Sequence, residues 1–242
     1  MASDLFLRAA SMDWDGVDKS SYLWNIPAIA GVEWVDFDKP VTCFVGENGS
    51  GKSTLLEAMA INCGFNPEGG TKHYSFSTFD SHSELNQCMR LIKGPKKPRW
   101  GYFLRAESFY NVATAEAEYS RNGGQPQRLH EKSHGESFLA MVHNNFQGGG
   151  MYLLDEPEAA LSPQRQLTLL REIYVCARAG AQFFLVTHSP ILLGMPGADI
   201  RTFDDGPIHS IEYEETDSYQ ITKTFINHRE QVLKNLLDGG LE

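Results

Sequence analysis

Residues 46–53, with the sequence GENGSGKS, have the residue types and spacing of a phosphate-binding loop. Glycines allow the backbone N–H groups of such a loop to turn inward around phosphate oxygens, and the positive end of a following helix adds to the attraction. Lys52 would reach the β- and γ-phosphates of a nucleotide, and the Ser53 hydroxyl would hold a magnesium ion. The segment therefore predicts a site for a nucleoside triphosphate and magnesium. The residues expected to bind the nucleotide are Glu47, Asn48, Gly49, Ser50, Gly51, Lys52, Ser53 and Thr54.

Two adjacent carboxylates follow an apolar run later in the chain. Residues 151–154 are Met-Tyr-Leu-Leu, and Asp155 and Glu156 come directly after them. This is the Walker B pattern, in which Asp155 would hold the magnesium ion and Glu156 would polarise the attacking water. The plainer interpretation, that two acids merely end a strand, is much weaker in a chain that also carries the loop at residues 46–53.

A histidine follows another apolar run. Residues 183–187 are typical of a buried strand, and His188 lies just past its end. Ligands of open α/β sheets sit at the carboxyl ends of the strands. A lone histidine is usually structural, but this placement favours a role at the nucleotide. His188 therefore joins Lys52 and Glu156 as a candidate catalytic residue.

The sequence Ser-His-Gly-Glu-Ser at residues 133–137 precedes an amphipathic segment. Ser133 and Glu136 have the spacing of a capping box, which predicts that a helix begins here. The apolar side chains at helical spacing behind it are Phe138, Leu139, Met141, Val142 and Phe146.

Alternating or continuous apolar runs predict the elements that position these motifs. Strands are expected at residues 22–27, 32–37, 41–45, 85–92, 100–104, 151–154, 183–187, 200–203 and 208–213, with hairpins around residues 93–99 and 204–207. Helices are expected at residues 54–61, after Ser133, from Pro163 and at residues 219–237. The predicted packing faces are Leu167, Leu170, Ile173, Tyr174 and Ala177 in the third helix, and Phe225, Ile226, Val232, Leu233, Leu236 and Leu237 in the last. Tyr22 or Trp24 would either stack on adenine or, as the simpler interpretation has it, pack within the sheet.

The composition is that of a globular protein with one large α/β domain. The chain has 242 residues, 41% of them hydrophobic and 21% charged, with a formal net charge of -10. That charge argues against broad, nonspecific nucleic-acid binding. A local basic patch remains, in the turn that carries Lys93, Lys96, Lys97 and Arg99. This turn would contact nucleic acid or an acidic partner, or it is simply a solvated hairpin tip.

Cysteine usage and hydropathy predict a cytoplasmic protein. Cys43, Cys63, Cys88 and Cys176 lie far apart in the sequence, which indicates reduced core thiols rather than a metal site. No apolar run reaches the length needed to span a membrane, and the start of the chain lacks a signal-peptide core. If the protein works at a membrane, a partner must take it there.

Together the motifs resemble those of ATP-binding-cassette (ABC) ATPases: phosphate loop, serine-glycine signature, Asp-Glu strand end, Ala-Leu-Ser loop and strand-end histidine, in this order. Residues 47–50 and 155–163 are most similar to stand-alone predicted ATPases of the SMC/RecF-like branch. The resemblance implies an α/β P-loop NTPase head over residues 1–242, with a mostly parallel core sheet, an antiparallel β subdomain and a small helical lobe. The core lobe would comprise about residues 1–63 and 148–242, and the inserted lobe about residues 64–147.

The resemblance also implies a homodimer that closes head-to-tail on two ATP molecules. Ser133 and Gly135 would cap the γ-phosphate bound to the other subunit, since the N-terminus of the capping-box helix is a ready anion site. Residues 160–162 match the loop that crosses the dimer interface. The remaining motif residues would act on the ATP of their own subunit, and the cycle would drive a protein partner encoded nearby, in DNA maintenance or phage defence.

The chain departs from the family pattern at two places. Lys132, His134 and Glu136 replace three positions of the usual Leu-Ser-Gly-Gly-Gln signature. Arg-Ala-Glu-Ser at residues 105–108 stands where a glutamine normally follows the strand that links the lobes, which makes Glu107 a candidate magnesium or water contact. Two alternatives therefore stay open: the ATPase subunit of an ABC transporter, and a regulatory ATP-binding module with little turnover.

Overall fold

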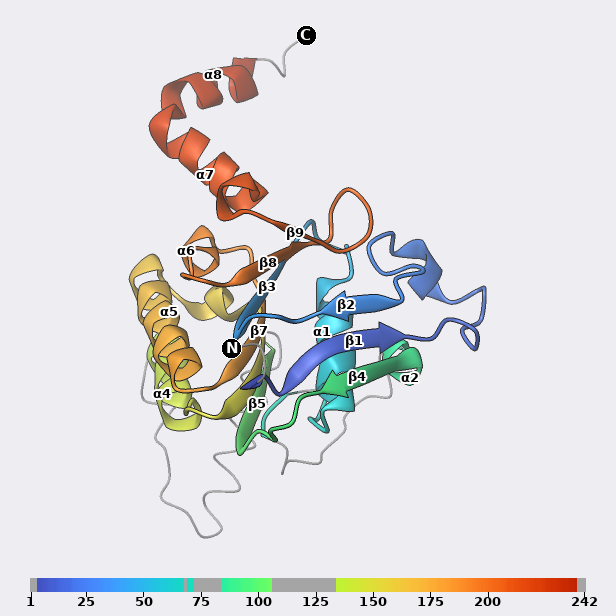
Figure 1. Ribbon diagram of the computed structural model, residues 1–242. Coiled ribbons are helices and arrows are strands. Elements are labelled where there is room, and N and C mark those ends of the chain that lie inside the picture. The colour runs from blue at the N-terminus through green and yellow to red at the C-terminus, as the bar shows by residue number, and fades with distance from the viewer. Residues whose placement is uncertain (1–3, 68, 72–83, 106–133, 239–242) are drawn as a thin grey trace.

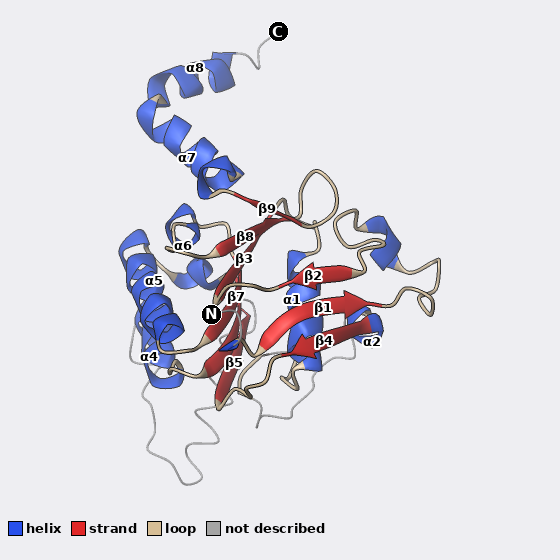
Figure 2. Ribbon diagram, in the orientation of Figure 1, coloured by secondary structure: helices blue, strands red, loops and turns tan. Residues whose placement is uncertain are grey.

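The computed structural model describes residues 4–67, 69–71, 84–105 and 134–238 and contains two β-sheets (Figures 1 and 2). The strands of the central sheet are β3 (Val41–Val45), β5 (Trp100–Arg105), β6 (Gly150–Asp155), β7 (Gln182–Val186), β8 (Asp199–Thr202) and β9 (His209–Ile211). Their order is β5-β6-β7-β3-β8-β9. The first five strands in this order run parallel, and β9 runs antiparallel at the edge. The predicted α/β fold with a mostly parallel core sheet is confirmed.

The smaller sheet is antiparallel, with β1 (Leu7–Met12) between β2 (Trp34–Asp36) and β4 (Met89–Lys93). It is the predicted antiparallel β subdomain. The buried side chain of Gln182, at the start of β7, ties it to the central sheet. Its Oε1 accepts hydrogen bonds from the backbone N–H groups of Phe6 and Leu7 at 2.9 Å, and its Nε2 donates to the Leu7 carbonyl at 2.8 Å.

Helix α1 (Lys52–Asn62) lies between the two sheets (Figure 1). Side chains of a strand alternate between its two faces, so the buried strands build two separate cores. Phe44 of β3 packs with α1 in one core, whereas Cys43 and Val45 pack in the other. The second core is covered by α4 (His134–Asn145), α5 (Pro163–Arg178) and α6 (Pro190–Leu193).

The remaining elements are short or peripheral. They are the 3₁₀ helices η2 (Tyr22–Asn25), η4 (Pro157–Ala160) and η5 (Tyr213–Glu215), and the α-helices α2 (Leu85–Cys88), α7 (Asp217–Asn227) and α8 (Arg229–Asp238). Among the described residues, no helix combines the length and the apolar character that crossing a membrane requires.

Two predicted strands were wrong. The predicted strand at residues 22–27 is the 3₁₀ helix η2, because the Ser21 hydroxyl accepts a hydrogen bond from the Leu23 N–H and starts a turn instead of an extended run. The run at residues 85–92 divides into α2 and β4. The predicted hairpin around residues 93–99 is also wrong, because β4 pairs with β1 whereas β5 pairs with β6 in the other sheet. The hairpin of β8 and β9 is confirmed.

The predicted packing faces hold only in part. In α5 the buried stripe runs through Leu169, Ile173 and Cys176, so Leu167 and Tyr174 are exposed. The predicted tail helix is two helices, since the backbone leaves helical geometry at His228 (φ -129°, ψ 34°). The two helices project from the body (Figure 1), and the exposed apolar side chains on them are Ile221, Phe225, Ile226, Leu236 and Leu237.

None of the four cysteines is joined in a disulfide, and the predicted core position holds for two of them. Cys43 and Cys176 are buried, whereas Cys63 and Cys88 are partly exposed. Burial raises the pKa of Cys43 to about 12, so this thiol stays protonated at neutral pH. β4 and β5 fall within residues 64–147, the range predicted for the inserted lobe, yet they belong to the two sheets. The boundary of that lobe stays a prediction.

Candidate functional site

The sequence motifs meet at the carboxyl edge of the central sheet. Strands β3, β6, β7 and β8 are parallel, so the segments that follow them emerge at the same edge. These segments are the loop at residues 46–51, the acids at 155–156, Thr187 with His188, and Phe203 with Asp204. The buried strands thus fix which chain segments can face a ligand at this edge.

The phosphate-loop lysine is folded onto its own loop. Lys52 is 4% exposed, and its Nζ donates to the carbonyl oxygens of Gly46 and Glu47 at 2.7 Å each. Burial lowers the pKa of Lys52, and the negative charge of Asp204 is the strongest of those that oppose this shift. Gly51 directly before the helix has a φ of 99°, and a Cβ there would lie 2.7 Å from side-chain atoms of Ile26 and Ile29, so only glycine fits.

Ser53 and Asp155 form the direct link between the phosphate loop and the Walker B strand. The Ser53 hydroxyl donates to Asp155 Oδ1 at 2.9 Å, although β7 separates β3 from β6 in the sheet. A hydroxyl and a carboxylate are hard oxygen ligands of the kind that Mg²⁺ takes together with substrate phosphates. Within the described part of the chain, no group of three or more His, Cys, Asp or Glu side chains is placed to hold a metal by itself. The residues present therefore fit a magnesium ion that shares its ligands with a nucleotide.

Glu156 points away from Asp155. Its backbone is left-handed (φ 49°, ψ 51°), which is uncommon for a residue other than glycine and is found at functional sites more often than elsewhere. Its N–H donates to the Val186 carbonyl at 2.9 Å, and its Oε1 lies 4.0 Å from His188 Nε2. The two acids therefore face different partners, with Asp155 turned to Ser53 and Glu156 turned to His188.

Glu158 positions the backbone of His188. Its Oε1 accepts a hydrogen bond from the His188 N–H at 2.6 Å, while its Oε2 is buried without a hydrogen-bond partner among the described residues. Burial raises the pKa of Glu158, and hydrogen bonds from backbone N–H groups oppose part of that rise. The sequence analysis did not single out this residue.

Asp204 makes a comparable contact with the phosphate loop. Its Oδ1 accepts a hydrogen bond from the Glu47 N–H at 2.9 Å. The sequence analysis assigned Asp204 only to a hairpin turn. A usable signal was nevertheless present, because Asp204 follows a predicted strand of the same sheet just as His188 does.

The described end of the predicted signature, Gly135 and Glu136 at the start of α4, lies on a different layer from the phosphate loop. Gly135, at the start of α4, packs so closely on the end of η4 and the start of α5 that a Cβ would lie 3.0 Å from the Ala160 carbonyl oxygen and would clash with Arg165 Nη1. Arg165 also pairs with Glu136 at 3.2 Å. Helix α4 covers the face of the central sheet opposite α1 (Figure 1). Ser133 and Glu107 lie outside the described residues.

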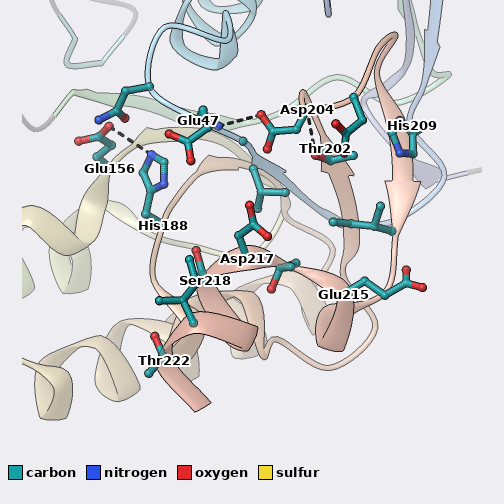
Figure 3. Close-up of a pocket in the computed structure, with 17 residues that line it drawn as sticks. Glu47, Glu156, His188, Thr202, Asp204, His209, Glu215, Asp217, Ser218 and Thr222 are labelled. Atoms are coloured by element: carbon teal, nitrogen blue, oxygen red, sulfur yellow. Dashed lines mark hydrogen bonds and ion pairs between the residues drawn. The ribbon is translucent and has the colours of Figure 1, made fainter. Parts of the chain in front are cut away.

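A pocket of about 470 Å³ lies beside the phosphate loop (Figure 3). Gly46, Glu47 and Asn48 line it together with Glu156 and His188, and the opposite wall comes from η5 and the first turns of α7. The carboxylates in its lining are Glu47, Glu156, Asp204, Asp205, Glu215 and Asp217. Such a lining attracts cations, and Lys52, Ser53 and Asp155 are not among its residues.

The aromatic candidates for adenine stacking lie elsewhere. Tyr22 and Trp24 do not line this pocket, and the Trp24 ring packs against Trp14 with ring centroids 4.7 Å apart. The Trp24 indole N–H also donates to the Asp18 carbonyl at 3.0 Å. Trp24 is exposed and belongs to η2, so its contact with Trp14 is local packing outside the sheet and differs from the simpler interpretation.

Comparison with known proteins adds independent findings. A family model described as "AAA domain" matches residues 23–143, and a second, described as "AAA domain, putative AbiEii toxin, Type IV TA system", matches residues 117–194. The Hemin import ATP-binding protein HmuV of Pseudomonas aeruginosa is 27% identical over 175 residues, which cover 60% of this chain and 64% of that protein. The chain thus spans about 64% of the length of this curated relative.

Two solved structures match the chain at low sequence identity. The SMC head domain from Thermotoga maritima has a TM-score of 0.49 and 16% identity over 86% of this chain and 100% of that one. A putative metal-chelate type ABC transporter in an inward-facing conformation has a TM-score of 0.45 and 17% identity over 89% of this chain and 88% of that one.

Proposed function

The chain belongs to the AAA domain family and is an ABC/SMC-like P-loop ATPase, as its motifs predicted. From this premise we propose that it binds ATP with Mg²⁺ at the carboxyl edge of the central sheet and hydrolyses the ATP. The observation that carries the proposal is the 2.9 Å hydrogen bond from the Ser53 hydroxyl to Asp155 Oδ1. It places two oxygen ligands suited to Mg²⁺ at the N-terminus of α1, one residue from the buried Lys52.

Each residue then has a distinct role in phosphoryl transfer. The loop backbone at residues 47–53, with Thr54 behind it, cradles the phosphates, and the Lys52 ammonium balances the charge of the β- and γ-oxygens. Bound Mg²⁺, held by Ser53 and Asp155, supplies charge stabilisation to the same oxygens. Glu156 accepts a hydrogen bond from the attacking water and orients it, and His188 contacts the γ-phosphate side from the neighbouring strand end. The water oxygen bonds to the γ-phosphorus as the bond from this phosphorus to its bridging oxygen breaks, the proton that the water loses passes to an oxygen of the departing phosphate, and ADP and phosphate leave.

We also propose that two copies share the reaction. Helix α4, which begins with the predicted signature, lies on the face of the central sheet opposite α1. This separation supports a role for Ser133 and Gly135 at the nucleotide of a second copy rather than at their own. The dimer would be head-to-tail and ATP-dependent, and it would drive a separate protein partner in a process such as DNA maintenance or phage defence.

The Lys52→Ala variant tests the site. A charge-assisted hydrogen bond contributes about 1.5–3 kcal/mol, so losing the ammonium should weaken ATP binding by about 10- to 100-fold. Titration with a fluorescent ATP analogue measures this loss. Lys39→Ala is the matched control, because Lys39 is an exposed lysine just before the amino end of β3, away from the ligand edge. Unchanged ATP affinity in Lys52→Ala would remove the basis for the whole assignment.

A second function, the ATPase subunit of a transporter, is favoured by one observation. The relative from Pseudomonas aeruginosa is named as the ATP-binding protein of hemin import. Co-purification of the chain with a membrane subunit encoded near its gene would support this function, and isolation with a soluble partner would favour the first. A phosphate-release assay separates both from a regulatory module with little turnover.

A further inference from the structure

Arg105 is the last residue of β5, and it lies at the carboxyl edge next to the Walker B strand. β5 pairs in parallel with β6, and in this register Arg105 stands opposite Asp155. The Arg105 Nε lies 4.0 Å from Asp155 Oδ2, and its Nη1 donates to Glu57 Oε2 at 2.8 Å. The guanidinium therefore lies between carboxylates from two different elements.

The two oxygens of Asp155 face different groups. Oδ1 accepts the hydrogen bond from Ser53, and Oδ2 faces Arg105. Glu57, which holds Arg105, stands four residues after Ser53 on α1, one helical turn along the same face. The contacts thus close a ring in which α1 reaches Asp155 twice, through Ser53 directly and through Glu57 and Arg105.

The guanidinium of Arg105 suits the charges of this ring. The side chains of Glu57 and Asp155 are each 12% exposed, and that of Arg105 is 24% exposed. Two carboxylates this little exposed repel each other and lose hydration, which a guanidinium with a forked set of donors offsets. A lysine ammonium is a compact charge without the rigid planar fork of a guanidinium, so it would not hold both carboxylates in the same geometry.

We propose that Arg105 is a positioning residue for Asp155, which holds this carboxylate in the orientation that binds Mg²⁺ and links it to α1 through Glu57; this rests on the proposed magnesium-dependent ATP site. The physical reason is that a carboxylate can rotate and can move away from its metal unless its second oxygen is also restrained. Groups that hold a metal-binding side chain from behind change metal affinity by about 10- to 100-fold when they are removed.

The test separates magnesium binding from nucleotide binding. ATP affinity is measured by titration in excess Mg²⁺ and again in EDTA, and the ratio of the two affinities is the magnesium-dependent gain. Arg105→Ala should lower this gain by about 10-fold or more and leave the affinity in EDTA within about twofold of the wild type. Glu57→Gln should lower the gain less, and the double variant should lose no more than Arg105→Ala alone, since both changes act through one ring.

A matched control is available on another strand of the same sheet. Arg201 on β8 pairs with Asp199 through Nε and Oδ2 at 2.6 Å, and both side chains are as little exposed as those of the ring. Arg201→Ala removes an equivalent ion pair away from Asp155 and should keep the wild-type gain. If Arg105→Ala fails to fold, Arg105→Lys, which keeps the charge, should fold and show a magnesium-dependent gain below that of the wild type; a wild-type gain in Arg105→Lys would overturn the positioning role.

The outcomes are distinct. A wild-type protein without any magnesium-dependent gain would contradict the proposed function itself. If the wild type shows the gain and Arg105→Ala retains or increases it, the positioning role of Arg105 is overturned while the proposed function stands. An equal loss of affinity in Mg²⁺ and in EDTA would also overturn it, because it would show that Arg105 supports the loop in general.

Discussion

Glu156→Gln should stop hydrolysis while leaving the fold and nucleotide binding intact. The change keeps the size of the side chain and removes the charge that orients the attacking water. A positioned carboxylate of this kind contributes about 10²- to 10⁴-fold to a rate, so the ATPase rate should fall by at least about 100-fold. The trapped ATP should then let the head-to-tail dimer accumulate.

The cost to stability follows from the exposure of the pair that Glu156 forms. The Glu156 side chain is 47% exposed, and its His188 partner is 40% exposed at a distance of 4.0 Å. An exposed ion pair contributes about 0–1 kcal/mol, so the midpoint of thermal unfolding should shift by no more than about 4 °C. The left-handed backbone of residue 156 is the same for glutamine, and it adds no difference.

The assays are phosphate release for the rate and light scattering with and without Mg-ATP for the dimer. Glu33→Gln is the matched control, because it makes the same change at an exposed glutamate that does not line the pocket. It should keep the wild-type rate. Ser133→Arg should block the dimer without loss of ATP binding by the monomer.

Two results would refute this reasoning in different ways. A rate that falls less than about tenfold in Glu156→Gln would show that another group orients the water. A variant that binds ATP without turnover yet stays monomeric would show that the isolated chain does not form the sandwich, so that a different protein must complete the site.

The remaining predictions concern nucleic acid and pH. The isolated protein should bind duplex DNA weakly, because its net charge is -10 and Lys96 of the basic turn pairs with Asp4 at 2.9 Å. Tight DNA binding with a steep salt dependence, abolished by charge reversal at Lys96 and Lys97, would contradict this prediction. Burial raises the pKa of Glu158 above its ordinary value of 4.5, so its contribution to stability is complete below about pH 4.5 and is lost as the pH rises through the native pKa. The difference in free energy of unfolding, Glu158→Gln minus wild type, should therefore increase as the pH rises from about 4.5 to about 8 in urea titrations. A difference that stays constant with pH would exclude an effect of this carboxyl.

The strands that carry the motifs could be predicted because they are buried on both faces. Residues 41–45, 151–154 and 183–187 are continuous apolar runs, and the structure buries every one of them between two layers. The segment at residues 22–27 was instead predicted from alternating apolar positions, yet a serine hydroxyl that accepts a backbone hydrogen bond makes residues 22–25 a 3₁₀ helix. A local contact of one side chain therefore outweighed the alternation that had predicted a strand.

The pairing of strands depended on partners far away in the chain. Residues 89–93 and 100–105 are both strands, and their short separation predicted a hairpin. Each strand has its partner elsewhere, β1 for the first and β6 for the second. Burial between α1 and the sheets decides this arrangement, and no feature of the intervening turn reports it. The tail helices were likewise expected to pack by an apolar face that the structure leaves exposed.

The site residues that motif analysis missed have a physical property in common. Asp204 accepts a hydrogen bond from the backbone N–H of Glu47, and Glu158 accepts one from the backbone N–H of His188. A backbone N–H is present at every residue except proline, so such a contact places no requirement on the type of its partner. Sequence spacing therefore contains no matching pair to detect.

Arg105 differs from these two residues because both of its partners are carboxylates, and its pairing has a definite charge pattern. Its signal was the sequence position itself, a charged residue that ends an apolar strand next to the Walker B strand. The lack of the usual glutamine drew attention to Glu107 instead, two residues further on. The register of β5 with β6 makes Arg105 the residue opposite Asp155, and a register can be assigned only when the neighbouring strand is known. In this sheet, the residues that end the parallel strands are therefore the candidates for contacts with the motif residues at the carboxyl edge.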